Sequence, residues 1–207
     1  ELGEDLFKAF LRDHTAECEA ALNFSKSGEK EKAFEFMKRS AEGGYIKGQL
    51  FLGLWLRQGK NIEVNYEQAE FWYNKAADQG SGTAYHNIGY MYEYGHGKEI
   101  NVKTAYEYYE KSKELESFFG YRNIATAYYF GELEGYEQDY EKAYNLFLKA
   151  IELGDNTSSH FYLSLMFAKG YHVEKDIIKA FEYLEAGKVA GSEKCKEKYQ
   201  KMINCLE

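Results

Sequence analysis

The chain has 207 residues, a length typical of one or two domains, and it contains 20 tyrosines, 14 phenylalanines and no proline. Its 44% hydrophobic residues are too many for a disordered acidic tail. Its net charge of −8 disfavours nonspecific binding to nucleic acid or to an anionic membrane. No apolar stretch approaches the roughly 20 residues needed to cross a bilayer, so we expect no membrane insertion.

Three cysteines, Cys18, Cys195 and Cys205, are too few and too unevenly spaced for a disulfide framework. Unpaired thiols favour a reducing compartment, which slightly favours the cytoplasm. The chain starts at Glu1 rather than at methionine. Removal of a signal peptide therefore stays open, and with it a periplasmic or secreted location.

The sequence repeats with a period close to 36 residues. An alanine preceded by Lys, Gln or Thr recurs at spacings of 36, 36, 38 and 37 residues. A glycine follows eleven residues later in four of the five units, and Glu116 replaces it in the third. A fixed period of this size indicates a stack of similar structural units. These alanines, here called the repeat alanines, are Ala33, Ala69, Ala105, Ala143 and Ala180.

Each unit predicts two helices. Helix A carries apolar residues at helical spacing and ends at a glycine that can take the left-handed C-cap conformation. Helix B begins at an Asn or Asp four residues before the repeat alanine, where the side-chain oxygen can cap a backbone N–H. The glycines are Gly59, Gly95, Gly131 and Gly170. The N-caps are Asn65, Asn101, Asp139 and Asp176.

Small residues recur on helix A, and we expect them to let helix A approach helix B closely. Large packing partners are expected on helix B, three residues after each repeat alanine. Because one helix pair cannot bury its apolar face alone, the units are predicted to stack on one another. The small residues are Gly48, Ala84, Gly120 and Ser159. The large residues are Phe36, Trp72, Tyr108, Leu146 and Tyr183.

The run from Ala84 to Tyr92, followed by Gly95 and Gly97, resembles the Sel-one-like repeat (SLR) family, a relative of the tetratricopeptide repeat. The stretches 68–80 and 141–150 resemble it too, and the resemblance covers roughly residues 14–191. The first unit departs from the family in its shortened loop, and the third in lacking Ala-Ala and the terminal glycine. The paired cysteines of the disulfide-rich branch of the family are absent.

This resemblance implies an all-α fold, a right-handed α/α superhelical solenoid of about five helix-pair repeats with terminal capping helices. We expect a single repeat domain over residues 1–207. Its predicted parts are an N-terminal cap at 1–13, repeats at 14–44, 47–80, 83–116, 119–154 and 158–191, and a charged C-terminal capping helix at 192–207.

Sequence motifs for catalysis or metal binding are missing. The five histidines form no H-E-x-x-H motif and no Cys–His zinc spacing, and no G-x-S-x-G motif occurs. Gly95 and Gly97 lack the third glycine of a nucleotide-binding loop, and no predicted strand precedes them. We therefore predict no catalytic residue, no metal site and no cofactor.

The resemblance implies that helix A lines a concave surface, where residues off its core stripe would face a partner. Asn87 and Asn123 are 36 residues apart and are expected to clamp either the backbone of an extended segment or, with help from Arg122, a terminal carboxylate. Tyrosines on this face would supply rigid contact area. The predicted partner-binding residues are His86, Asn87, Tyr90, Glu93, Tyr94, Arg122, Asn123, Thr126, Tyr129, Phe161 and Tyr162. The same face also carries Leu50, Leu54, Arg57 and Leu165.

The function that the resemblance implies is a non-catalytic scaffold or adaptor that binds a partner protein or peptide through the concave helix A surface. An alternative is a bacterial immunity protein that neutralises a toxin or secreted effector, since a short acidic protein can mask a basic active site. A third is an enzyme or an enzyme-associated domain. We expect a monomer or weak oligomer, a partner whose basic charge the net charge of −8 favours, and no binding to nucleic acid.

Overall fold

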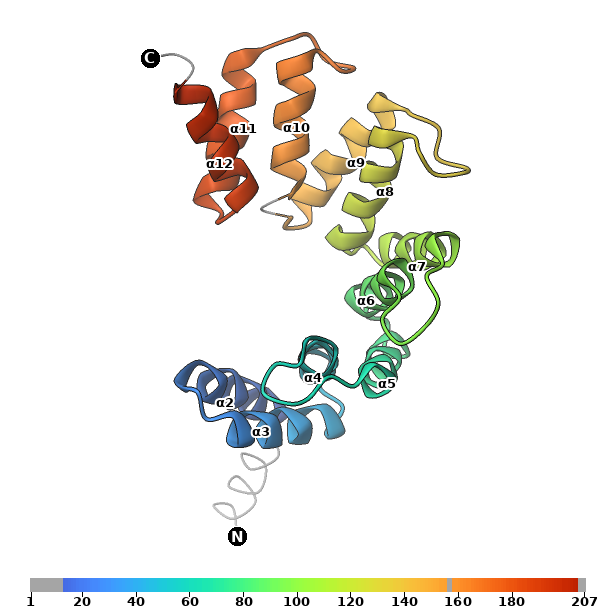
Figure 1. Ribbon diagram of the computed structural model, residues 1–207, viewed down its shortest axis with the longest axis vertical. Coiled ribbons are helices and arrows are strands. Elements are labelled where there is room, and N and C mark those ends of the chain that lie inside the picture. Colours follow the sequence, from blue (N-terminus) through green and yellow to red (C-terminus); the bar gives the residue numbers. More distant parts are fainter. Residues whose placement is uncertain (1–12, 156–157, 205–207) are drawn as a thin grey trace, which may run out of the picture. The chain divides into compact units, whose positions relative to one another are not determined.

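The computed structural model describes residues 13–155 and 158–204, and these ranges contain eleven α-helices and no β-strand. The chain divides into two compact units, Glu1–Tyr108 (unit 1) and Tyr109–Glu207 (unit 2). The all-α repeat fold is thus confirmed (Figure 1). The helices are α2 (His14–Ser27), α3 (Lys30–Glu42), α4 (Ile46–Gln58), α5 (Tyr66–Ala77), α6 (Gly82–Tyr94), α7 (Val102–Glu114), α8 (Phe118–Phe130), α9 (Tyr140–Glu152), α10 (Ser158–Lys169), α11 (Ile177–Val189) and α12 (Glu193–Asn204).

The predicted helix ends are confirmed. At each predicted N-cap the side-chain oxygen accepts a hydrogen bond, 2.9 to 3.0 Å long, from the backbone N–H three residues later. Each such bond satisfies a donor that the first helical turn leaves free. The glycines that end helix A all have positive φ, as a left-handed C-cap requires.

The core of each repeat is built on the repeat alanines, which are fully buried. The large side chain that is fully buried lies four residues after the alanine, while the predicted partner, three residues after it, packs against this core and stays partly exposed. With 3.6 residues per turn, the fourth residue lies about 40° from the alanine around the helix, whereas the third lies about 60° away at the edge of the buried stripe. The buried partners are Met37, Tyr73, Tyr109, Phe147 and Leu184.

Small residues do allow close approach of the two helices, as predicted. A Cβ atom added at Gly48 would lie 3.0 Å from the backbone nitrogen of Ala41, and one added at Gly120 would overlap the backbone of Lys113. Ala84 is fully buried in α6. A glycine at two of these positions is therefore a packing requirement, because any side chain would displace the neighbouring helix.

Within each unit, consecutive helices pack against each other (Figure 1). In unit 1, α2 packs on α3 and α4 on α5; in unit 2, α8 packs on α9 and α10 on α11. Helix α12 packs on α11 and buries Cys195 completely, so a terminal helix stands where one was expected. The cap at 1–13, apart from Asp13, and Cys205 lie outside the described residues. The single domain over 1–207 stays a prediction.

Candidate functional site

The predicted partner-binding residues of unit 1 lie on α6. Tyr94 is the most accessible of them at 54% exposure, and Asn87, Tyr90 and Glu93 are partly exposed. The rings of Tyr90 and Tyr94 lie one turn apart, with 4.3 Å between their centroids. His86 is buried at 9% exposure, which corrects the expectation that it faces a partner. The accessible part of the predicted surface is therefore centred on the two tyrosines.

Arg57, from α4, lies against the same face. Its guanidinium carbon is 4.5 Å from the centroid of the Tyr90 ring, within the range of a cation–π contact. No acidic oxygen of the described residues lies within 4.0 Å of this guanidinium, and its Nε atom is buried without a hydrogen-bond partner. Arg57 adjoins the buried Tyr73 side chain: burial raises the pKa of Tyr73, and hydrogen bonding from Arg57 and then its positive charge oppose that rise. An aromatic ring thus holds a cation that no internal carboxylate neutralises.

The loop after α6 adds a histidine to this group. The imidazole of His96 stacks on Tyr66, with 5.1 Å between ring centroids, and lies 5.5 Å from the Tyr90 ring. Burial, and to a lesser extent the charge of Arg57, lowers the pKa of His96. The imidazole is therefore neutral at pH 7, and Arg57 carries the positive charge. We call Arg57, Tyr66, Tyr90, Tyr94 and His96 the Arg57 cluster.

Arg122, which was predicted to hold a partner's carboxylate, is paired inside unit 2. Its Nη1 atom lies 3.6 Å from Oδ1 of Asp155, whose side chain is 1% exposed. The other oxygen of Asp155 accepts hydrogen bonds from the Ser159 backbone N–H (3.0 Å) and hydroxyl (2.6 Å). A buried carboxylate needs such partners, because loss of its counter-ion is strongly destabilising. This corrects the prediction: Arg122 neutralises an internal carboxylate.

Tyr129 is also a packing residue. It is 8% exposed, and its ring centroid lies 5.3 Å from that of Tyr162 and 5.5 Å from that of Tyr140. Burial raises the pKa of Tyr129 to about 12, and the neighbouring tyrosines add to the rise. Tyr162 in turn stacks on Phe147 at 4.9 Å. The expectation that Tyr129 offers accessible contact area is therefore wrong.

Three predicted residues of unit 2 keep partly exposed side chains. Asn123 and Phe161 are partly exposed, and the Thr126 hydroxyl donates to the backbone carbonyl of Arg122 at 2.9 Å. Asn87 belongs to unit 1 and Asn123 to unit 2. The joint grip of the two asparagines on a partner stays a prediction.

The two units stack aromatic rings at equivalent repeat positions. Tyr66 and Tyr140 each follow an N-cap, and His96 and Tyr171 each follow a glycine that ends helix A. The Tyr140 and Tyr171 rings stack with 4.4 Å between centroids, as Tyr66 and His96 do in unit 1. In both units the stack joins the start of helix B to the loop that follows the next helix A.

Arg57 and Tyr129 are the residues beside these two stacks. Each lies two residues before the glycine that ends its helix A, so they occupy the same repeat position. In unit 2 the position is filled by a buried ring, and in unit 1 by a guanidinium group. The difference gives unit 1 a charged group where unit 2 has only packed aromatic residues.

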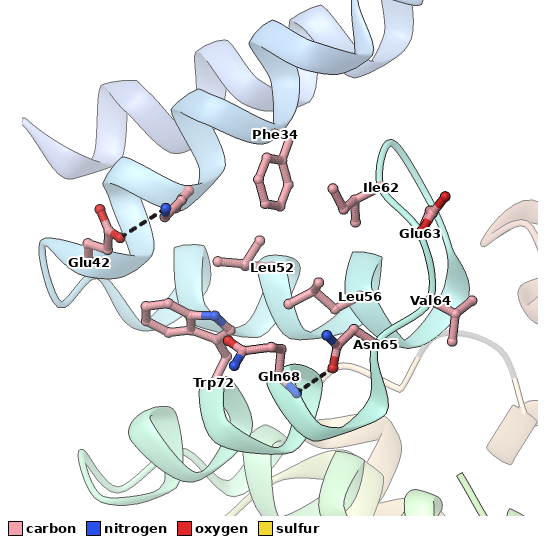
Figure 2. A pocket seen from close by; sticks show the side chains of 11 residues that line it. Phe34, Glu42, Leu52, Leu56, Ile62, Glu63, Val64, Asn65, Gln68 and Trp72 are labelled. Atoms are coloured by element: carbon pink, nitrogen blue, oxygen red, sulfur yellow. Dashed lines mark hydrogen bonds and ion pairs between the residues drawn. The ribbon is translucent and has the colours of Figure 1, made fainter. Parts of the chain in front are cut away.

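Unit 1 also contains a groove between α3 and α5, bordered by α4 (Figure 2). Its volume is about 470 Å³, and Phe34, Leu52, Leu56 and Trp72 point into it from the three helices. The loop after Gly59 closes one end. The remaining lining residues are Lys38, Glu42, Ile62, Glu63, Val64, Asn65 and Gln68.

Unit 2 has a smaller hollow of about 320 Å³ at the corresponding place, between α9 and α11 beside α10. Trp72 and Tyr183 line the two hollows and both lie three residues after a repeat alanine. These predicted packing partners do pack against the core, and one side of each also borders a surface groove.

The described residues show neither a cluster of metal ligands nor a membrane-spanning helix. Among the residues that the structure describes, no three His, Cys, Asp or Glu side chains converge as metal ligands would. None of the described helices combines the length and the apolar character that crossing a bilayer demands.

Comparison with known families settles the kind of repeat. The model of the Sel1 repeat matches residues 26–45, 46–81, 82–117, 119–155 and 157–187. The chain belongs to the Sel1 repeat family. Sel1 repeats mediate protein interactions, and their fold is typical of scaffolds that are generally non-catalytic.

Solved structures with the same repeat resemble the chain over most of its length. A protective antigen of uropathogenic Escherichia coli with an SLR fold is 26% identical with a TM-score of 0.69, over 98% of this chain and 44% of its own. A Sel1 repeat protein from Oxalobacter formigenes is 26% identical with a TM-score of 0.66, over 84% of this chain and 49% of its own. The chain thus spans less than half the length of each of these two proteins.

A third solved structure is matched over nearly its whole length. A Sel1 repeat protein from Klebsiella pneumoniae is 20% identical with a TM-score of 0.57, over 94% of this chain and 95% of its own. At this identity the similarity supports the fold alone. Among curated protein sequences no match is found.

Proposed function

We propose that the chain is a non-catalytic scaffold that binds a partner protein or peptide, and that the Arg57 cluster together with Asn87 forms the contact surface. The observation that carries the proposal is the unneutralised Arg57 guanidinium on the Tyr90 ring, which in turn lies 4.3 Å from the exposed Tyr94 ring. Tyrosine and arginine are among the residues that most often dominate the binding energy of interfaces. Arg122 and Tyr129 are left out because internal contacts already occupy them.

The net charge of −8 supports a partner that is basic outside the contact itself. Opposite net charges speed the encounter of two proteins, and salt screens this attraction over about 10 Å at 0.1 M ionic strength. The association rate should therefore fall as salt is added. The dissociation rate should depend mainly on the Arg57 cluster, because short-range contacts determine how long a complex lasts.

Affinity capture from the source cell, read by mass spectrometry, tests this proposal. The variant Asn87→Ala/Tyr94→Ala truncates the accessible residues of α6. Its matched control, Asn123→Ala/Phe130→Ala, changes the same repeat positions on α8, and melting curves verify that both variants fold. We expect the first variant to lose a dominant partner that the control retains. If neither variant changes the set of captured proteins, the helix A face is not the contact surface.

The alternative function, a bacterial immunity protein, is supported by the acidic net charge, which suits the masking of a basic active site. The captured partner distinguishes the two functions. If the partner is a toxin or effector whose activity disappears when an equal amount of the chain is added, the immunity function holds. If its activity is unchanged in the complex, the chain acts as a scaffold.

A further inference from the structure

Arg57 carries a full positive charge at a partly buried position, and no acidic oxygen of the described residues lies within 4.0 Å of its guanidinium. The Tyr90 ring packs against its guanidinium, and its Nε atom is buried beside the Tyr73 side chain, so the Nη groups are the ones that a ligand would contact. Charges that are withdrawn from water are normally paired, because the lost hydration is costly unless a counter-charge replaces it. A ligand with the opposite charge would complete this environment.

We infer that Arg57 receives a carboxylate group from the bound partner. The planar guanidinium presents a fork of N–H donors that matches the two oxygens of a carboxylate, and the Tyr90 ring fixes the orientation of that plane. The exposed Tyr94 ring offers packing area for the apolar part of the same segment. This inference rests on the proposed function, because it names the group that the scaffold recognises.

A carboxylate fits this environment better than a phosphate does. His96 is neutral at pH 7, so the Arg57 cluster offers one positive charge, whereas a phosphate group carries nearly two negative charges at that pH. Burial raises the pKa of Tyr94, and the nearby charge of Glu93 adds to the rise. The negative charge of Glu93 also repels a dianion more than a monoanion. A monoanion is therefore the matching ligand.

Unit 2 supplies a matched control for the arginine. Tyr129 occupies the same repeat position as Arg57, and unit 2 packs its ring among other aromatic side chains. Arg57→Tyr should therefore keep a side chain that this position can accommodate while it removes the cation. Arg57→Lys keeps the charge but replaces the planar fork by a single ammonium group.

The test is a nuclear magnetic resonance titration of the full chain with three blocked tyrosyl dipeptides. The first carries a glutamate side chain and an amidated C-terminus, the second a glutamine and a free C-terminal carboxylate, and the third a glutamine and an amidated C-terminus. We expect the Arg57 Nε–H signal to shift saturably with at least one acid. The acidic peptide that binds more tightly shows whether the partner's carboxylate comes from a glutamate side chain or from a chain end. The neutral peptide should bind at least about tenfold more weakly than the tighter acid, because it lacks the charge-assisted hydrogen bonds.

The variants are followed through the ring signals of Tyr94 and His96. Arg57→Tyr should bind the acids no better than the neutral peptide, and Arg57→Lys should lose about tenfold in affinity for the acids. Equal binding of all three peptides to the unaltered chain, or no saturable Arg57 shift with either acid, would overturn the inference. A captured partner that Arg57→Tyr retains but Asn87→Ala/Tyr94→Ala releases would also overturn it while the scaffold function stands.

Discussion

Glu116 adopts a backbone conformation that the neighbouring repeats give to glycine. Its φ of +53° lies in the left-handed region, like those of Gly80 and Gly154 at equivalent positions. A residue with a Cβ atom costs about 1–2 kcal/mol in this region. The hydroxyl of Tyr121 donates to Oε1 of Glu116 at 3.0 Å, but this bond is exposed to water and offsets little of the cost.

Glu116→Gly should therefore raise the free energy of unfolding by about 1 kcal/mol, measured by urea denaturation. The control is the reverse exchange, from glycine to a residue with a Cβ atom, at the equivalent position Gly80. An added Cβ at Gly80 would meet no atom within 4 Å, so Gly80→Ala tests the backbone conformation alone and should lower the free energy by a similar amount. A Glu116→Gly protein that unfolds at lower urea would mean that the Tyr121 hydrogen bond outweighs the backbone strain.

Gly120 tests the close approach of two helices. A methyl group at this position would overlap the backbone of Lys113, which cannot rotate away as a side chain can. Gly120→Ala should lower the free energy of unfolding by about 1–3 kcal/mol, the usual cost of overpacking. Asn145→Ala on the exposed face of α9 is the control and should change it by less than about 0.5 kcal/mol. Equal melting temperatures of the two variants would contradict the packing role of Gly120.

Sequence could place Arg122 and Tyr129 on helix A but could not tell whether they were free. The repeat fixes which face of the helix a residue occupies, because the period and the cap positions are regular. It does not reveal that Asp155, 33 residues later, presents a buried carboxylate to Arg122. Nor does the repeat show that the Tyr129 ring packs near the rings of Tyr140, Phe147 and Tyr162. Such contacts depend on side chains that differ from repeat to repeat.

At the scale of the helix, the N-caps make a clear prediction. The Asn65 side chain accepts a hydrogen bond from the Gln68 backbone N–H at 2.9 Å. Asn65→Ala should lower the free energy of unfolding by about 1 kcal/mol, while Asn65→Asp should retain the cap, as Asp139 does in unit 2. Chemical denaturation of the two variants separates these outcomes. Equal losses would show that the side-chain oxygen contributes nothing at this helix end.

The helix B pattern shows where prediction from sequence reached its limit. Caps, ends and repeat alanines follow rules of local chemistry and were placed correctly. The fully buried fourth residue after the alanine was not singled out, because the third and fourth are both large in several repeats, as with Trp72 and Tyr73 or Tyr108 and Tyr109. Only the packing of the neighbouring helix decides which of two adjacent large residues is buried.

At the scale of the whole molecule, a histidine links stability to pH. Burial lowers the pKa of His160 below its ordinary value of 6.5, although the charge of Asp155 opposes the shift. The Tyr183 ring lies 6.2 Å from the imidazole, and Lys179 and Glu182 border the same hollow. Since the unfolded chain binds a proton more readily than the folded one, protonation favours unfolding.

The contribution of neutral His160 is thus fully present above pH 6.5 and is lost as the pH falls from there through the folded-state pKa. We expect the melting temperature to fall over this range. Gln49 occupies the equivalent repeat position as a buried neutral side chain, so His160→Gln is the matched variant. Its melting temperature should depend less on pH over the same range. Parallel curves for the two proteins would show that His160 does not link stability to pH.

The whole-molecule architecture was the most predictable feature, and the contact surface the least. A period of 36 to 38 residues with small residues at fixed places leaves few folds other than stacked helix pairs. Arg57 had appeared only as one residue of a long stripe. Its special position becomes visible when the structure shows Tyr90 beside it and no carboxylate near it.

The helices that pack closely are neighbours or next neighbours along the chain. Contacts of such short sequence separation close small loops and form within microseconds to milliseconds. A ribosome that adds about 5–20 residues per second needs seconds to make one repeat. Within each unit, a new helix pair can therefore dock on its predecessor before the next pair leaves the exit tunnel. The apolar faces of the repeats would then spend little time open to aggregation during synthesis.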